Sequence, residues 1–336
     1  MWTRVWRSCV ALLAGLTCVR AEEDACPPAC ACERGSGTVS CGAAVAGVPA
    51  RVPPWTSTLI VRGREVTTLR RGAFRDNGTE LDVATLSLSS NMIRVIEADA
   101  FSGLPRVHVL DLSRNRLEVV SDGAFNGLLE LRTLCLNQSI APGGAAAQLW
   151  AALASPSLWN LHRLELAGNG LRSIPPAQSG LHQLVLVNNS IETVSGDDVT
   201  RLDQQRRTRV YLSQNPFRCT CDLEAFYHWL KNSSLQCPDA ALLRCSQPDA
   251  RKGLALEKLR GEDVDCVNEK LEAVSYVFLG MVLALIGLVF LMVLYLNRGG
   301  IKRWVNNIRE ACRDHMEVYH YRYEQDSDPR LANVAV

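Results

Sequence analysis

Residues 86–101 read LSLSSNMIRVIEADAF, and a second stretch further along the chain matches them almost position for position. The second stretch, residues 110–125, reads LDLSRNRLEVVSDGAF and begins 24 residues after the first. Both fit the pattern L-x-x-L-x-L-x-x-N-x-L. A repeat of this length cannot bury its apolar side chains alone, so neighbouring copies must stack and share one core. These two stretches therefore predict a repeat protein.

Five weaker copies complete the series, and they begin at Leu59, Leu131, Leu161, Leu181 and Val210. The pattern is that of the leucine-rich repeat, and about seven copies predict an α/β solenoid shaped as a horseshoe. In each short strand the leucines should point inward and the residues between them outward. An asparagine follows the strand in most copies, where its amide can bond to unpaired backbone groups of the stack. These asparagines are Asn91, Asn115, Asn169, Asn189 and Asn215.

The period breaks at residues 140–157, which are rich in alanine, glycine and proline. We interpret them as an insertion with one short helix over residues 145–154. On this interpretation the insertion divides the solenoid into two halves, residues 59–139 and 158–215. A binding loop and a spacer without a specific role are both open interpretations of the insertion.

Two apolar segments predict export and a membrane anchor. Residues 1–21 combine Arg4 and Arg7, an apolar core and small residues at Val19 and Ala21, as a cleaved signal peptide does. Residues 274–296 are 23 residues without a charge, which is long enough to cross about 30 Å of hydrocarbon as a helix. Basic residues follow this run, so residues 297–336 should be cytoplasmic. We expect a single-pass type I protein of the plasma membrane, with its N-terminus outside.

The chain has thirteen cysteines, most of them in two clusters on either side of the repeats. The first cluster holds Cys26, Cys30, Cys32 and Cys41, and the second holds Cys219, Cys221, Cys237, Cys245 and Cys266. Exported clusters of this kind favour disulfides. A zinc site at Cys219, Cys221, His228 and Cys237 has unsuitable spacing. Because the ends of a solenoid expose its core, both clusters are interpreted as caps.

Four N-x-[ST] sequons fall in the expected extracellular part, at Asn77, Asn137, Asn188 and Asn232, and predict N-glycosylation. Asn137 and Asn188 are assigned the same phase of their repeats, one place after the last strand leucine. Glycans on both would cover part of the concave face. Arg163, Glu165 and Gln183 are the candidate ligand contacts on that face.

Composition and motifs argue against several classes of function. A net charge of +1 does not suit a nucleic-acid binder. The chain contains no phosphate loop, HExxH or GxSxG motif, so we predict no enzyme, no cofactor and no metal. His108, His162 and His182 take variable repeat positions and are expected to be surface residues. Arg201, Arg206, Arg207 and Arg209 suit an acidic partner or a sulfated sugar, although a solvated surface is the simpler interpretation.

The tail carries the most distinctive sequence. Residues 297–331, NRGGIKRWVNNIREACRDHMEVYHYRYEQDSDPRL, closely resemble the juxtamembrane tail of the trophoblast glycoprotein family. Residues 243–266, LRCSQPDARKGLALEKLRGEDVDC, and the membrane span resemble it too. The resemblance implies a cell-surface glycoprotein in adhesion, motility or the dampening of Wnt signalling. The C-terminal residues 333–336 add a possible PDZ-domain partner by strand addition.

The cysteine clusters resemble the caps of extracellular leucine-rich-repeat proteins, and that resemblance implies specific disulfides. They are Cys26–Cys32, Cys30–Cys41, Cys219–Cys245 and Cys221–Cys266, with Cys135 and Cys237 left over. From the sequence alone other pairings stay open.

The expected organisation has six parts: a signal peptide (1–21), an N-terminal cap (22–53), repeats (54–214), a C-terminal cap (215–267), a transmembrane helix (274–296) and a cytoplasmic tail (297–336). Two functions follow. The first is a non-enzymatic surface glycoprotein that binds protein partners through its repeats and modulates signalling. The family resemblance implies that this modulation is inhibition of Wnt signalling. The alternative is a cell-cell adhesion or synapse-organising protein.

Overall fold

The computed structural model describes residues 25–42, 47–49, 51–63, 66–75, 80–143, 146–176, 180–265 and 267–326. The predicted signal peptide, Asn77, Cys266 and residues 327–336 lie outside these ranges. The chain forms two compact units, residues 1–265 and 266–336, which are described separately.

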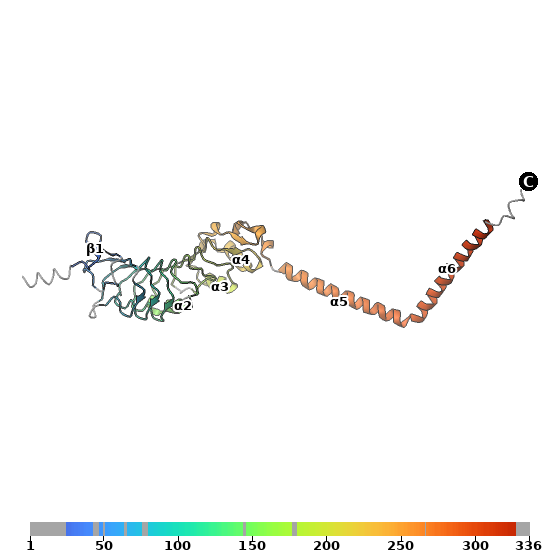
Figure 1. Cartoon of the computed structure of the whole chain (residues 1–336), viewed down its shortest axis with the longest axis horizontal. Helices are drawn as coiled ribbons and strands as arrows, with labels where there is room; N and C mark the ends of the chain where they lie inside the picture. The colour runs from blue at the N-terminus through green and yellow to red at the C-terminus, as the bar shows by residue number, and fades with distance from the viewer. Residues whose placement is uncertain are drawn as a thin grey trace, which may run out of the picture. The chain divides into compact units, whose positions relative to one another are not determined.

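A nine-stranded sheet runs through the N-terminal cap and the repeats of the first unit (Figure 1). Its order is β1-β2-β3-β5-β7-β9-β10-β11-β12, antiparallel between β1 and β2 and parallel at the other pairings. The strands are β1 (Cys30–Glu33), β2 (Thr38–Cys41), β3 (Thr58–Val61), β5 (Thr85–Ser87), β7 (Val109–Asp111), β9 (Thr133–Cys135), β10 (Arg163–Glu165), β11 (Gln183–Val185) and β12 (Arg209–Tyr211). The seven strands from β3 to β12 correspond to the seven predicted repeats, which confirms the solenoid.

The core lies behind this sheet, because the central residue of each repeat strand points inward. Leu59, Leu86, Leu110, Leu134, Leu164, Leu184 and Val210 pair in register and are buried. On the opposite side of the core runs a smaller sheet of β4 (Thr68–Leu69), β6 (Val95–Ile96) and β8 (Val119–Val120). Phe74, Phe101 and Phe125 stack there with ring centroids 5.8 and 6.0 Å apart. Burial of each such side chain stabilises the stack by about 1.5–3 kcal/mol.

The repeat asparagines form a ladder that satisfies backbone groups of neighbouring repeats. Asn189 shows the pattern: its Nδ2 donates to the carbonyl oxygens of Leu166 and Leu186, both at 3.0 Å. Its Oδ1 accepts from the backbone N–H groups of Asn169 at 2.9 Å and Leu171 at 3.1 Å. In the fourth repeat Ser139 takes this position, is fully buried, and donates to the Leu112 carbonyl oxygen at 2.9 Å.

The segment that breaks the sequence period does not divide the solenoid. Strand β9 before it pairs directly with β10 after it, with Leu134 opposite Leu164. The predicted helix is present as α2 (Ala146–Leu153), and it buries Leu149, Ala152 and Leu153 in the common core. The expectation of two halves is therefore wrong, because α2 supplies the outer wall of the fourth repeat and lets the sheet continue.

The last repeats are followed by a cap built from short elements. Helix α3 (Gly196–Gln204) still belongs to the repeats and precedes β12. In the cap, α4 (Glu224–Asn232) packs Phe226 against Phe217, with ring centroids 5.7 Å apart. Strand β13 (Phe217–Arg218) pairs with β14 (Cys245–Gln247). Seven 3₁₀ helices complete the described elements: η1 (Pro156–Leu158), η2 (Cys221–Leu223), η3 (Ser234–Gln236), η4 (Ala240–Leu242), η5 (Asp249–Arg251), η6 (Leu256–Lys258) and η7 (Gly261–Asp263).

Disulfides are present at both ends of the repeats. The structure bonds Cys26 to Cys32, Cys30 to Cys41, and Cys219 to Cys245. These are three of the pairs that the resemblance implies. Cys221 is also disulfide-bonded, and its expected partner Cys266 lies outside the described residues. Cysteines held in disulfides do not supply the thiolates of the alternative zinc site.

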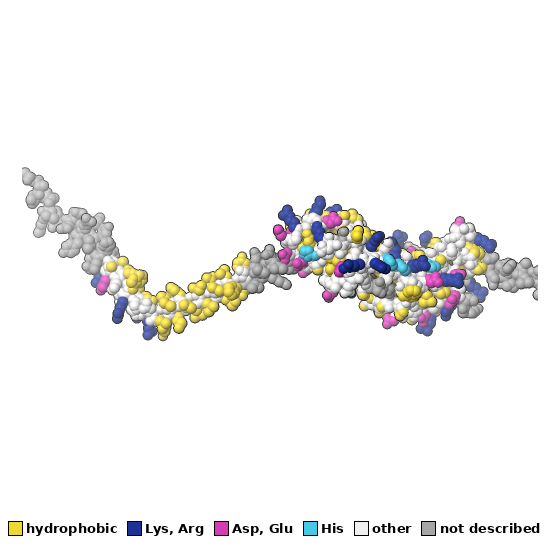
Figure 2. All heavy atoms as spheres, turned by 180° about the vertical axis from the view of Figure 1, so that it is seen from behind, with side chains coloured by type: hydrophobic (Ala, Val, Ile, Leu, Met, Phe, Trp, Pro, Cys, Tyr) yellow, Lys and Arg dark blue, Asp and Glu magenta, His cyan; other side chains and the backbone are white. Residues whose placement is uncertain are grey.

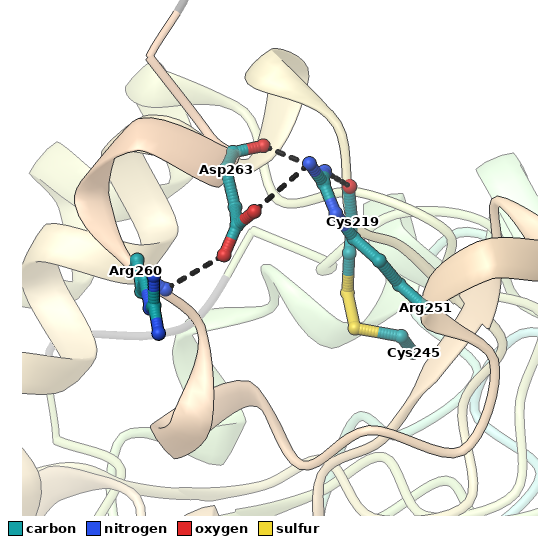
Figure 3. Close-up of a disulfide and its surroundings, with 5 residues drawn as sticks. All are labelled: Cys219, Cys245, Arg251, Arg260 and Asp263. Carbon is teal, nitrogen blue, oxygen red and sulfur yellow. Dashed lines mark hydrogen bonds and ion pairs between the residues drawn. A yellow bond between two sulfur atoms is a disulfide. The ribbon is translucent and has the colours of Figure 1, made fainter.

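Arg251 links the C-terminal disulfide to the end of the first unit (Figure 3). Its guanidinium donates to the carbonyl oxygens of Cys219 at 2.8 Å and Asp263 at 2.7 Å, and lies 3.0 Å from the Asp263 carboxylate. The other oxygen of that carboxylate accepts from the Arg260 backbone N–H at 2.9 Å. The cap is thus held by a covalent bond and by a charge-assisted network around it.

The second unit consists of α5 (Val267–Leu296) and α6 (Arg298–Asp326). Within α5, residues Ser275–Leu296 are long and apolar enough to cross a membrane. At about 1.5 Å per residue this span matches a hydrocarbon core of about 30 Å. Figure 2 shows the helix as an almost continuous yellow surface with dark blue side chains beyond its end, where Arg298, Lys302 and Arg303 begin the tail.

Candidate ligand-binding surface

Strand register arranges the outward residues of the repeats in two rows across the nine-stranded sheet. The first row is Thr58, Thr85, Val109, Thr133, Arg163, Gln183 and Arg209, and the second is Ile60, Ser87, Asp111, Cys135, Glu165, Val185 and Tyr211. Hydroxyl and apolar side chains prevail on the first four strands. Both arginines of the first row lie on the last three strands, so this end of the sheet is the more polar one.

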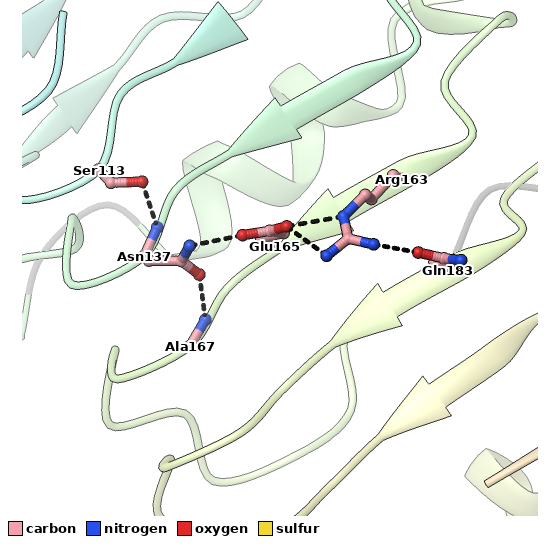
Figure 4. A network of polar contacts seen from close by, with 6 residues as sticks. All are labelled: Ser113, Asn137, Arg163, Glu165, Ala167 and Gln183. Atoms are coloured by element: carbon pink, nitrogen blue, oxygen red, sulfur yellow. Dashed lines mark hydrogen bonds and ion pairs between the residues drawn. The ribbon is translucent and has the colours of Figure 1, made fainter. Parts of the chain in front are cut away.

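The three predicted ligand contacts lie together on strands β10 and β11 (Figure 4). The Nε of Arg163 donates to Glu165 at 2.6 Å, and a terminal guanidinium nitrogen lies 2.6 Å from the same oxygen. The other terminal nitrogen donates to Gln183 on the next strand. Neutralised by Glu165, Arg163 presents a fixed pattern of donors rather than a free charge.

Asn137 extends this network to the preceding repeats. Its Nδ2 donates to Glu165 at 2.7 Å, its Oδ1 accepts from the backbone N–H of Ala167 at 2.9 Å, and its own N–H donates to Ser113 at 3.3 Å. Sequence reasoning missed this role, because the partners are up to 30 residues away. The Nδ2 atom that a glycan would occupy is therefore engaged in the fold.

The two central sequons differ in their surroundings, and the assignment of both to one phase is wrong. Leu134 and Leu184 both pair with Leu164, so Asn188 corresponds to Gln138 rather than to Asn137. Asn188 and Gln138 share a positive φ, +55° and +52°, and both are exposed. Asn232, the last residue of α4, is also exposed. Asn188 and Asn232 thus remain accessible, whereas Asn137 is half-buried.

A hollow of about 450 Å³ opens where several strands end. Its lining is polar: Ser89, Asp111, Ser113, Arg114, Asn137, Gln138, Ala167, Gly168 and Asn188. The hollow adjoins the Asn137 network, and Asn188 stands at its border. A ligand that entered it would meet hydroxyl, amide and carboxylate groups.

The first unit holds two cysteines outside disulfides, one on the repeat surface and one in the cap. Cys135 lies between Asp111 and Glu165 in the second row. Burial, and then the negative charges of Glu165 and Asp111, raise the pKa of Cys135 to about 12. Cys237 in the cap is buried, and burial together with Asp239 raises its pKa as well. Neither cysteine forms a disulfide in the structure, and both thiols are neutral at physiological pH.

Among the residues that the structure describes, no three histidine, cysteine or acidic side chains are grouped to hold a metal ion. The surface instead offers fixed hydrogen-bonding groups on a rigid sheet, which is the chemistry of recognition. Fold, caps and surface define a capped leucine-rich-repeat protein, and one helix of the described part of the chain is long enough to span a membrane.

Comparisons with known proteins identify the family. The leucine-rich repeat family model matches residues 57–117 and 82–139. The chain is 43% identical to human trophoblast glycoprotein-like, over 91% of this chain and 88% of that protein. It is 37% identical to mouse trophoblast glycoprotein, over 93% of this chain and 85% of that protein. The chain belongs to the trophoblast glycoprotein family.

A solved structure agrees with this assignment. The crystal structure of human trophoblast glycoprotein, also named Wnt-activated inhibitory factor 1, matches with a TM-score of 0.59 and 27% identity. The match covers 72% of this chain and all of that chain. The capped solenoid is thus shared with a solved member of the family.

Proposed function

We propose that this protein is a single-pass glycoprotein of the plasma membrane that binds a protein partner through its repeat surface and lowers Wnt signalling in its own cell. The Arg163–Glu165–Gln183 network carries the first part of this proposal, because its donors and acceptors are held in place before a partner arrives. The name Wnt-activated inhibitory factor of the solved relative supports the second part.

The proposed organisation keeps the six parts expected from the sequence, from the signal peptide at 1–21 to the cytoplasmic tail at 297–336. Basic residues after the span favour a cytoplasmic tail, and the sequons before it favour an extracellular repeat unit. Asn188 and Asn232 are the proposed glycan sites within the described residues. A PDZ-domain protein remains a proposed partner of the C-terminus.

A Wnt-reporter assay in cells that express the full chain tests the proposal. A chain that ends after Gly299 should lower the reporter equally, because the repeat unit and the anchor are retained. If neither chain changes the reporter while both reach the cell surface, the Wnt assignment fails. An aggregation assay of the same cells then tests the adhesion alternative.

The binding surface is tested by a triple variant, Arg163→Ser, Glu165→Ser and Gln183→Ser. We expect the reporter effect to fall about tenfold or more, since the loss of one interface hot spot costs about 2 kcal/mol or more. Arg70→Ser and Arg172→Ser, two exposed arginines outside these rows, form a control that removes charge away from the network. Full inhibition by the triple variant at the same surface level would show that the binding site lies elsewhere.

A further inference from the structure

A line of basic side chains crosses the sheet where the strands begin: His108, Arg132, His162 and His182 stand one position before their strands, and Arg209 is the first residue of β12. Backbone hydrogen bonds fix its order: Arg132 donates to His108, His162 to Arg132, His182 to His162, and Arg209 to His182, at 2.8–2.9 Å. Each step therefore moves by one strand, about 4.8 Å. Figure 2 shows dark blue and cyan side chains gathered on one face of the repeat unit.

The part of this line that is open to a ligand begins at Arg132. His108, before it, lies 3.2 Å from the carboxylate of Glu130 and is thereby partnered. Arg132, His162, His182 and Arg209 are all exposed, and within the part of the chain that the structure describes none of them forms an ion pair. We call these four residues the basic strip. Glu165, an acid of the second row, is bound to Arg163 and Asn137.

The two histidines of the basic strip stack face to face, with ring centroids 4.7 Å apart and planes 17° from parallel. Each ring lies against a backbone carbonyl through its Nδ1, that of Asn160 for His162 and that of Gly180 for His182. Both rings are therefore held in fixed positions between Arg132 and Arg209.

We propose that the basic strip binds a sulfated polysaccharide chain. The strip is an open row rather than a pocket, so it fits a linear ligand whose charges recur along its length. Sulfate esters are ionised at physiological pH, and they would neutralise Arg132 and Arg209.

The position of the predicted glycans is compatible with this ligand. Asn188 follows β11, whereas His182 precedes it, so the two lie at opposite ends of the strand. The hollow beside Asn188 also lies at the far end of the strands. A glycan on Asn188 would therefore leave the basic strip open.

Heparin affinity of the full-length protein in non-ionic detergent tests the proposal. Arg132→Gln with Arg209→Gln should weaken heparin binding about fivefold at physiological salt, given the modest value of exposed ion pairs. Arg70→Gln with Arg172→Gln removes the same charge elsewhere and should change binding less than about twofold. Arg132→Lys with Arg209→Lys should retain binding, which separates loss of charge from loss of structure.

A chemically altered ligand provides a second, independent readout. Desulfated heparin, which retains its carboxylates, should bind weakly. Equal loss in the strip and control variants would overturn the proposal, because binding would then follow net charge or the basic tail. Undiminished binding of desulfated heparin would also overturn it and would favour a carboxylate ligand such as an acidic peptide.

Discussion

Single buried amides connect neighbouring repeats, and Asn189 is the clearest case at the scale of one residue. Its side chain joins two carbonyl oxygens and two N–H groups that no strand hydrogen bond satisfies. It is only 7% exposed, so water cannot replace it. The asparagine of each repeat is therefore required by the backbone of its neighbours rather than by a ligand.

Asn189→Ala should destabilise the repeat unit by about 2–4 kcal/mol, because it leaves several backbone groups buried without partners. The change keeps the Asn188 sequon intact, so the variant and the wild type differ in stability for reasons other than the glycan. Thermal unfolding should show a midpoint lower by about 5 °C or more. Asn160→Ala, which removes one exposed bond to the Leu129 carbonyl, is the matched control and should cost less than about 1 kcal/mol. Equal midpoints for the two variants would contradict this account of the ladder.

Cys135 should react slowly with alkylating reagents although it lies on the outward face of the sheet. The thiolate is the reacting form, and burial with Glu165 and Asp111 nearby raises the pKa of Cys135 to about 12. The alkylation rate, followed by mass spectrometry of the peptide that contains Cys135, should rise about tenfold per pH unit from pH 8 to 10. The alkylation rate of glutathione, in contrast, should level off above an ordinary thiol pKa of about 8.5. Because folding raises this pKa, folding is penalised increasingly as the pH rises from about 8.5 towards 12. A rate plateau near pH 9 would show that the thiol is not shielded.

At the scale of elements, α2 decides whether the fourth repeat belongs to the solenoid. Gln148 accepts the backbone N–H of Val120 at 3.3 Å, so the helix continues the bonding of the outer sheet where β8 ends. Leu149 is fully buried in the common core. The helix thus replaces the short outer strand and the phenylalanine of the preceding repeats.

Leu149→Ala should destabilise the protein by about 2–5 kcal/mol, the usual cost of a cavity at a buried leucine. Ala151→Ser, on the exposed side of the same helix, should cost about 0.5 kcal/mol through helix propensity alone. Denaturant unfolding of the two variants measures the difference. Similar stabilities would restore the view that residues 140–157 are a spacer.

The sequence predicted the elements whose signal is periodic and missed those that depend on distant partners. Leucine spacing located all seven repeat strands, because inward and outward positions alternate in every copy. Residues 140–157 are rich in alanine and glycine, whose small side chains give no clear apolar period. The sequence therefore did not predict that α2 contributes to the core. The partners of Asn137 come from the next repeat, and their contact follows from a register that only the folded sheet fixes. Asn188 lies one position later in its repeat than Asn137 does, in the turn after the strand, and there its side chain is exposed whereas that of Asn137 is half-buried.

At the scale of the whole molecule, two sequence signals predict on which side of the membrane each unit lies. The predicted signal peptide would place the first unit outside, and the basic residues after the span, among them Arg298, Lys302 and Arg303, favour a cytosolic tail. The two signals agree, so topology should be uniform. The proposed ligands of the repeat surface and of the basic strip both require this orientation.

An epitope tag inserted after Ala21 should bind antibody on intact cells, whereas a tag at the C-terminus should bind only after the membrane is permeabilised. Arg298→Glu with Lys302→Glu and Arg303→Glu provides the stringent comparison, because it reverses the charge that favours the cytosolic side. If the cleaved signal dominates, this variant keeps the same topology, with a lower surface level since acidic residues contribute little to retention inside. Flow cytometry with both antibodies measures the fraction in each orientation. A C-terminal tag that is accessible on intact wild-type cells would place the repeat unit in the cytosol, where its disulfides would be reduced and the proposed surface functions would be excluded.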